Sequence, residues 1–191
     1  MPHTQETSGM TANTTRPRGT PGVPTDQRTE TLGVAFFDLS RMTEWASSEQ
    51  DETVAAFFQA FYQLAADHLV PTGARIVKFM GDAGLVVFPV DSAESAIFAL
   101  CDLSSDARET ARRFGLDAYL NVNIHVGPVV TGTFGPPELA RYDVIGKTVN
   151  IAARLGRRGI TLSAQAFRTL SDDGRKRFEK FLQPVTYRFR S

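Results

Sequence analysis

Two aspartates, Asp38 and Asp82, are the first candidates for chemistry in this sequence. Asp38 follows the apolar run 32–37, and Asp82 lies between two strand-like runs, 75–79 and 85–88. If the first strand lies beside that hairpin, the two carboxylates meet at one edge of the sheet. Paired carboxylates with no histidine or cysteine nearby suit Mg²⁺ or Mn²⁺, which bind carboxylate and phosphate oxygens together. The pattern therefore favours a metal–phosphate site.

The turn after Asp38 and a later helix extend this interpretation. Free backbone N–H groups in such a turn bind phosphate, so we expect substrate contacts from its residues, which are Ser40, Arg41, Met42 and Thr43. Asn150 and Arg154 are four residues apart on a predicted helix, 148–155, so they share one face. Taken singly, Asp38 and Asp82 also fit ordinary helix capping and turn chemistry. Polymerase palms and diguanylate cyclases place acids on a similar hairpin.

The elements that must position these residues follow the order strand, helix, strand, strand, helix, strand. This order predicts an α+β fold with a ferredoxin-like βαββαβ core and additional strands and helices at the C-terminus. The core elements are the strand 32–37, a helix ending at 69, the hairpin, a helix 92–114, and a strand 118–126 that ends at Gly127-Pro128. The additions are strands 129–134, 141–145, 160–162 and 185–189, and helices 148–155 and 164–170.

Composition limits the class of protein. The 191 residues fit one domain of ordinary size, and the balance of 21 basic and 21 acidic residues argues against a nucleic-acid partner. Residues 1–30 are rich in Thr, Pro, Gly and Gln, which predicts a disordered N-terminal arm before a single domain, 31–191. The sequence has no membrane-span or signal-peptide pattern, so we expect a cytoplasmic protein with no membrane partner.

Four segments in the same order resemble the class III adenylyl and guanylyl cyclases, a family of nucleotide cyclase catalytic domains. They are 36–39 (FFDL), 78–82 (KFMGD), 125–132 (HVGPVVTG) and 142–155 (YDVIGKTVNIAARL). The resemblance extends from residue 32 to about residue 170. It implies the class III cyclase fold, and a reaction in which the ribose 3′-hydroxyl attacks the α-phosphate to give a 3′,5′-cyclic monophosphate and pyrophosphate.

The resemblance also implies roles for single residues. Asp38 and Asp82 match the family's metal ligands, with the Leu39 carbonyl as a further ligand, for two Mg²⁺ or Mn²⁺ ions per site. Asn150 matches the residue that orients the ribose. Arg154 matches the residue that stabilises charge on the α-phosphate in the transition state.

Substrate choice and assembly follow from the same comparison. Lys78 and Asp143 match the pair that reads the adenine edge, and guanylyl cyclases usually have an acid where Lys78 stands. ATP is therefore favoured over GTP. In this family the metal aspartates come from one chain and the base readers, Asn and Arg come from its partner, so the resemblance implies a homodimer with two shared sites.

Two alternatives remain open at this point. One is a cyclase for another base, either a guanylyl cyclase or a pyrimidine cyclase making cyclic CMP or cyclic UMP in anti-phage defence. The other is an inactive cyclase-like module for dimerisation or nucleotide sensing. The sequence also departs from the family, which commonly has Gly-Phe where Arg41-Met42 stand, and no C-terminal basic residue aligns with the phosphate lysine of many relatives.

Overall fold

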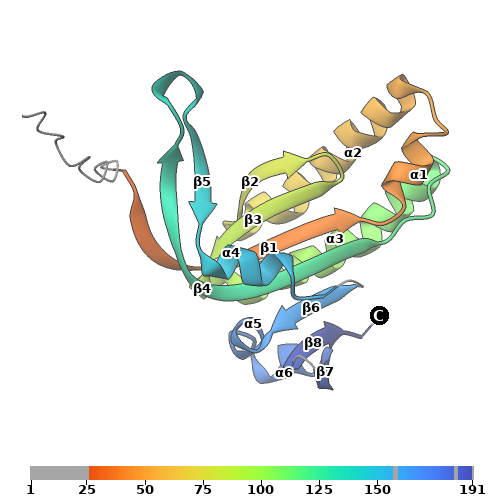
Figure 1. Ribbon diagram of the computed structural model, residues 1–191. Helices are drawn as coiled ribbons and strands as arrows, with labels where there is room; N and C mark the ends of the chain where they lie inside the picture. The colour runs from red at the N-terminus through yellow and green to blue at the C-terminus, as the bar shows by residue number, and fades with distance from the viewer. Residues whose placement is uncertain (1–25, 157–158, 183–184, 191) are drawn as a thin grey trace, which may run out of the picture.

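The computed structural model describes residues 26–156, 159–182 and 185–190 (Figure 1). Its strands are β1 (Arg28–Leu39), β2 (Arg75–Met80), β3 (Ala83–Pro89), β4 (Leu120–Phe134), β5 (Arg141–Ile145), β6 (Ile160–Ser163), β7 (Phe178–Leu182) and β8 (Val185–Phe189). Its helices are α1 (Met42–Ala46), α2 (Asp51–Leu69), α3 (Ala93–Arg113), α4 (Lys147–Ala153), α5 (Ala164–Arg168) and α6 (Asp172–Arg175). Short 3₁₀ turns lie at Val70–Thr72, Val90–Ser92 and Pro137–Leu139.

The strands within these ranges form one eight-stranded sheet in the order β2-β3-β1-β4-β6-β8-β7, with β5 paired to β4. The first four strands are antiparallel neighbours, and α2 and α3 cover one face of them (Figure 1). This arrangement confirms the predicted ferredoxin-like core and α+β fold. The sheet continues with β6, parallel to β4, and then with β8 and β7.

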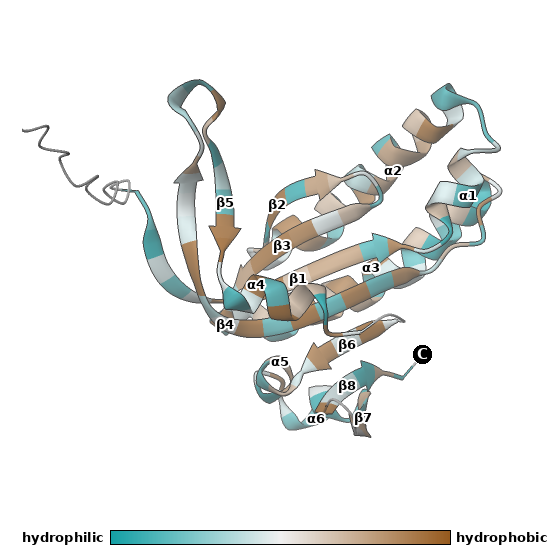
Figure 2. Ribbon diagram, viewed as in Figure 1, coloured by the Kyte–Doolittle hydropathy of each residue, from teal (hydrophilic) through white to brown (hydrophobic). Residues whose placement is uncertain are grey.

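Side chains alternate across β1, so each face of the sheet has its own apolar cluster. Ala35 and Phe37 face α2 and α3, where the ring of Phe37 meets that of Phe61 edge-on at 5.8 Å between centroids. Val34 belongs to a smaller cluster with Ala152 of α4 on the opposite face. The apolar residues along the central strands are visible in Figure 2. Asp38 is four positions after Val34 on the same strand, so both side chains lie on the face that α4 covers.

The structure corrects the predicted end of a strand at Gly127-Pro128, because β4 runs unbroken from Leu120 to Phe134. Proline lacks an N–H group and usually interrupts a backbone ladder. Here Pro128 lies between the part of β4 that pairs with β6 (122–124) and the part that pairs with β5 (130–134). Pro128 also stays in register with Thr31 of β1, and the strand continues through the proline into the β4–β5 hairpin.

The first strand begins earlier than predicted. β1 starts at Arg28, inside the segment 1–30 that composition predicted to be a disordered arm. Pairing with β4 holds this polar start without burying large apolar side chains. Thr131 donates a hydrogen bond to the carboxylate of Glu30, and the Thr133 N–H donates to the Asp26 carboxylate at 2.7 Å. Residues 1–25 of the predicted arm lie outside the described residues.

Three short elements were not predicted, namely α1, α6 and β7. The strand β7 lies at the end of the sheet. Phe178 is buried, but Glu179, Lys180 and Phe181 are exposed, so the segment shows no clear apolar pattern. Across the described part of the chain, no helix combines the length and hydropathy needed to cross a membrane.

Candidate active site

Asp38 and Asp82 lie together at one edge of the sheet. Asp38 is the penultimate residue of β1 and pairs with Ala83, the first residue of β3. Asp82 lies in the tight turn between β2 and β3, where the preceding Gly81 has a φ of 69° that favours glycine. The Leu39 N–H donates to the Asp82 carbonyl at 3.3 Å. Because N–H and C=O of one strand residue point to the same side, the Leu39 carbonyl also faces this turn.

The negative charges of the Asp38 and Asp82 carboxylates repel each other. Burial raises the pKa of Asp82, and the neighbouring Asp38 carboxylate raises that pKa further. Within the described residues, no cluster of three or more His, Cys, Asp or Glu side chains surrounds the pair. Two adjacent carboxylates and a backbone carbonyl are hard oxygen donors that fit Mg²⁺ or Mn²⁺, with phosphate oxygens and water completing the coordination. A divalent cation bound between Asp38 and Asp82 would offset the repulsion between their carboxylates.

The structure places only part of the predicted phosphate turn where it could bind substrate. The Ser40 N–H donates to the Tyr119 carbonyl at 3.0 Å, and the Ser40 hydroxyl accepts from the Tyr119 N–H at 3.0 Å. Ser40 therefore joins β1 to β4, and this corrects its predicted role as a phosphate donor. The side chain of Met42 is buried in the core. The N–H groups of Met42 and Thr43 begin α1, whose first turn leaves such groups without helical partners.

The side chain of Arg41 lies beside two acidic residues. Its guanidinium lies 3.5 Å from Asp117 and 3.9 Å from Glu44, and these residues line a pocket of about 240 Å³ beside α1. Its backbone has φ 64° and ψ 11°, a left-handed conformation that glycine adopts more readily. The family's glycine at this position agrees with that conformation.

Lys78 and Asp143 form an ion pair. The Lys78 Nζ lies 2.6 Å from Asp143 Oδ2, although Lys78 is on β2 and Asp143 is on β5. A second contact joins the same strands, because the Arg75 guanidinium lies 3.4 Å from the centroid of the Tyr142 ring. Both members of the ion pair remain partly exposed, at 42% and 30% of their side-chain surface. A donor and an acceptor are thus held together where a ligand can reach them.

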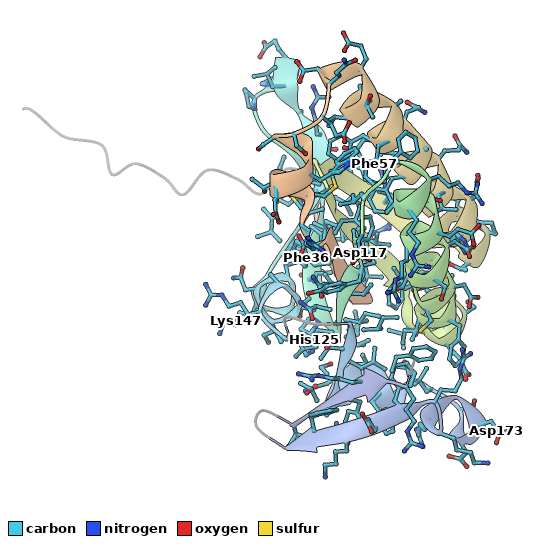
Figure 3. All side chains as sticks on the ribbon, turned by 90° about the vertical axis from the view of Figure 1, so that its right-hand side faces the viewer. Phe36, Phe57, Asp117, His125, Lys147 and Asp173 are labelled. Atoms are coloured by element: carbon cyan, nitrogen blue, oxygen red, sulfur yellow. The ribbon has the colours of Figure 1, made fainter. Side chains whose placement is uncertain are left out.

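Asn150 and Arg154 lie on the outer side of α4. The sequence predicted a helix 148–155 with Arg154 inside it. The helix instead ends at Ala153, and Arg154 is its C-cap. Both side chains are exposed, and with Lys147, Ile151 and Leu155 they line an open pocket of about 530 Å³. Figure 3 shows Lys147 pointing away from the sheet on the α4 side, whereas Phe57, a residue of α2, lies on the opposite side of the sheet. Asn150 and Arg154 therefore share a face that is open to solvent.

The predicted site residues thus form separate groups within one chain. In the described part of the chain, no hydrogen bond or ion pair joins the group at Asp38 and Asp82 to the groups at Lys78 and Arg154. Each of these groups is open to solvent and needs a further surface opposite it before it could enclose a substrate.

Two residues near the aspartates were missed by sequence reasoning. Asn121 on β4 donates from Nδ2 to Asp38 Oδ2 at 3.3 Å. The Tyr62 hydroxyl of α2 donates to the Gly81 carbonyl at 2.8 Å, and its ring stacks on Phe79 at 4.0 Å between centroids. Tyr62 gave no signal among the other aromatic residues of its helix. Asn121 did, because alternate polar residues interrupt an otherwise apolar strand, Leu120 to Ile124.

Curated proteins give matches that cover most of this chain. An uncharacterised protein of Mycobacterium tuberculosis is 31% identical over 162 residues, which are 77% of this chain and 28% of that protein. The germination-specific adenylate cyclase of Dictyostelium discoideum is 28% identical over 145 residues, which are 70% of this chain and 16% of that protein. The chain thus spans less than a third of the length of each of these relatives.

Solved structures show the same fold. The adenylyl cyclase CyaB from P. aeruginosa superposes with a TM-score of 0.76 at 19% identity, covering 87% of this chain and 96% of that chain. The guanylyl cyclase Cya2 superposes with a TM-score of 0.73 at 22% identity, covering 85% and 92%. The family model of the adenylate and guanylate cyclase catalytic domain matches residues 25–181. The chain therefore belongs to the class III adenylyl and guanylyl cyclase catalytic domain family.

Proposed function

We propose that this chain converts ATP to 3′,5′-cyclic AMP and pyrophosphate as a homodimer with shared sites. The observation that carries the proposal is that Asp38 and Asp82 adjoin at the sheet edge in a chain of the cyclase family. The four other residues that the reaction needs are present on β2, on β5, on α4 and at the C-cap of α4. An inactive module would be expected to lack one of these six.

The metal half of the site consists of Asp38, Asp82 and the Leu39 carbonyl. When bound there, two Mg²⁺ or Mn²⁺ ions would supply charge that favours ionisation of the ribose 3′-hydroxyl and neutralises the triphosphate. The N–H groups of Met42 and Thr43 are available beside this half for phosphate oxygens. The chain's own contribution here is to hold oxygen donors close together.

The second half consists of the base readers and α4. The Lys78 ammonium would donate to adenine N1, and the Asp143 carboxylate would accept from the adenine amino group. Asn150 would hydrogen-bond the ribose, and Arg154 would place its guanidinium against the oxygens of the α-phosphate. The 3′-oxygen forms a bond to the α-phosphorus, the bond from that phosphorus to the bridging oxygen breaks, pyrophosphate leaves, and the hydroxyl proton passes to solvent.

A homodimer explains why the two halves are not joined within one chain. Asp38 and Asp82 of one protomer would face Lys78, Asn150 and Arg154 of its partner, and two-fold symmetry would repeat the arrangement. Each symmetric dimer would hold two complete sites. The isolated monomer would be inactive.

Product identification tests the proposal. The purified protein is incubated with Mn²⁺ and separately with ATP, GTP, CTP or UTP, and products are identified by chromatography and mass. We expect cyclic AMP as the dominant product. Cyclic GMP, CMP or UMP as the dominant product would keep the chemistry and reject the assignment of the base, whereas no cyclic product from a folded dimer would reject the function.

A further inference from the structure

The face of β4 that carries Asn121 is unusually polar for the interior of a sheet. Asn121 and Asn123 alternate with the buried residues Leu120, Val122 and Ile124. Asparagine is depleted in strands because its short polar side chain packs poorly there. Both asparagines line a pocket of about 330 Å³ together with Asp38 and residues at the end of α4. They therefore lie between the metal half of the proposed site and the segment that carries Arg154.

Each asparagine has a distinct hydrogen-bond partner. Asn123 Nδ2 donates to the Gly156 carbonyl at 3.0 Å and so holds the segment just after α4. Asn121 bonds at both ends of its amide: Oδ1 accepts from the Gly159 N–H at 3.2 Å, and Nδ2 donates to Asp38 Oδ2 at 3.3 Å. Of the two asparagines, Asn121 hydrogen-bonds the aspartate and Asn123 does not, although each bonds a backbone group between α4 and β6, at Gly159 and Gly156.

The partners of Asn121 fix the direction of its amide. If the amide were turned over, its NH₂ group would face the Gly159 N–H and its carbonyl would face the Asp38 carboxylate. Both contacts would be repulsive, so the NH₂ group must point to Asp38. A neutral donor in this place restrains one carboxylate oxygen without the positive charge of a lysine or arginine, which would oppose a cation.

We propose that Asn121 is a positioning residue that holds the Asp38 carboxylate in place for a divalent cation. This inference rests on the proposed function. Partners that hold a ligating group through a hydrogen bond commonly change metal affinity by about 10- to 100-fold when they are removed. The long 3.3 Å bond places the effect of Asn121 toward the lower end of that range.

The test measures Mn²⁺ binding without turnover. The rise in thermal unfolding midpoint is followed as Mn²⁺ is added in the presence of α,β-methylene ATP, an analogue that cannot release pyrophosphate. Asn121→Leu is compared with Asn123→Leu, the same substitution two positions along the strand, at a residue that hydrogen-bonds Gly156 and no aspartate. Asn121→Ser is a smaller second variant should the leucine fail to pack. Asp38→Asn removes a proposed metal ligand and so gives the baseline for the Mn²⁺-dependent rise in unfolding midpoint.

We expect the Asn121 variants to need about tenfold more Mn²⁺ for the half-maximal rise, whereas Asn123→Leu stays within about twofold of the unmodified protein. The Mn²⁺ concentration for half-maximal cyclase activity should shift in parallel. Equal shifts in both asparagine variants, or no shift at Asn121, would overturn this inference while leaving the cyclase assignment in place. If the unmodified protein itself neither binds Mn²⁺ nor forms a cyclic nucleotide, the proposed function falls and this inference falls with it.

Discussion

Lys78 Nζ lies 2.6 Å from Asp143 Oδ2, and this ion pair joins β2 to β5, two strands that share no backbone ladder. The sheet order places β3, β1 and β4 between them. The contact forms because the β4–β5 hairpin extends beyond the end of the core sheet and β5 approaches β2 (Figure 1). A donor and an acceptor for a base edge are thereby set before any ligand binds.

Reversing the charge of Lys78 should weaken the preference for ATP. In Lys78→Glu the ammonium donor is lost and the new carboxylate faces Asp143. We expect kcat/KM for ATP to fall by about 10- to 100-fold, the effect of losing a charged hydrogen bond, and to fall less for GTP. Lys180→Glu on β7 carries the same charge change far from these residues and serves as the control. Unchanged ratios among the four nucleotides in Lys78→Glu would remove Lys78 from the base pocket.

Asp82→Asn should lower cyclase activity without lowering the thermal stability of the protein. Because burial and the Asp38 carboxylate raise the pKa of Asp82, its charged form is disfavoured in the folded protein, and stability falls as pH rises through that pKa. At neutral pH without metal, the variant should therefore be at least as stable as the unmodified protein in thermal unfolding. Its kcat should fall by about 100-fold or more, and Mn²⁺ should no longer raise its unfolding midpoint. Near-normal turnover by a folded dimer would contradict the metal assignment.

The sequence allowed the fold and the grouping of the acids to be predicted, because both depend on local patterns. The hairpin around Asp82 and the apolar run before Asp38 determine which strands adjoin. The contacts that Ser40 and Arg41 make could not be predicted in the same way. Their contacts with Tyr119 and Asp117 come from a segment that is distant in sequence, and only the folded chain brings them together.

Arg41→Gly tests whether the turn before α1 is strained. A left-handed conformation costs a non-glycine residue about 1–2 kcal/mol, whereas the exposed ion pair with Asp117 contributes about 0–1 kcal/mol. Arg41→Ala loses the same ion pair but keeps the strain, so it is the matched control. We expect the glycine variant to exceed the alanine variant by about 1 kcal/mol in free energy of unfolding, measured with urea. Similar KM for ATP in both variants and the unmodified protein would agree with the guanidinium lying away from substrate, whereas a large rise in KM in both would support its predicted contact with phosphate.

His125 should make stability depend on pH. Its Nδ1 lies 2.9 Å from the hydroxyl of Ser163, which caps α5, and burial lowers the pKa of His125 below its ordinary value. As pH falls from 7 to 5, the unfolded chain takes up a proton at this histidine before the folded chain does, so stability falls. His125→Gln removes this contribution, and its free energy of unfolding in urea should decline less over that interval. The same decline in both proteins would show that His125 does not titrate in this way.

We expect each active site to combine the metal half of one chain with the second half of another. The most direct test mixes Asp82→Asn protein with Arg154→Ala protein, each inactive alone, and measures cyclic AMP formation. In a mixed dimer one site contains both substitutions and the other contains neither, so activity should return toward about one quarter of the unmodified level if subunits exchange at random. Subunit exchange is verified with two different affinity tags. Activity that returns with exchange would support the shared site, and no recovery despite proven exchange would contradict it.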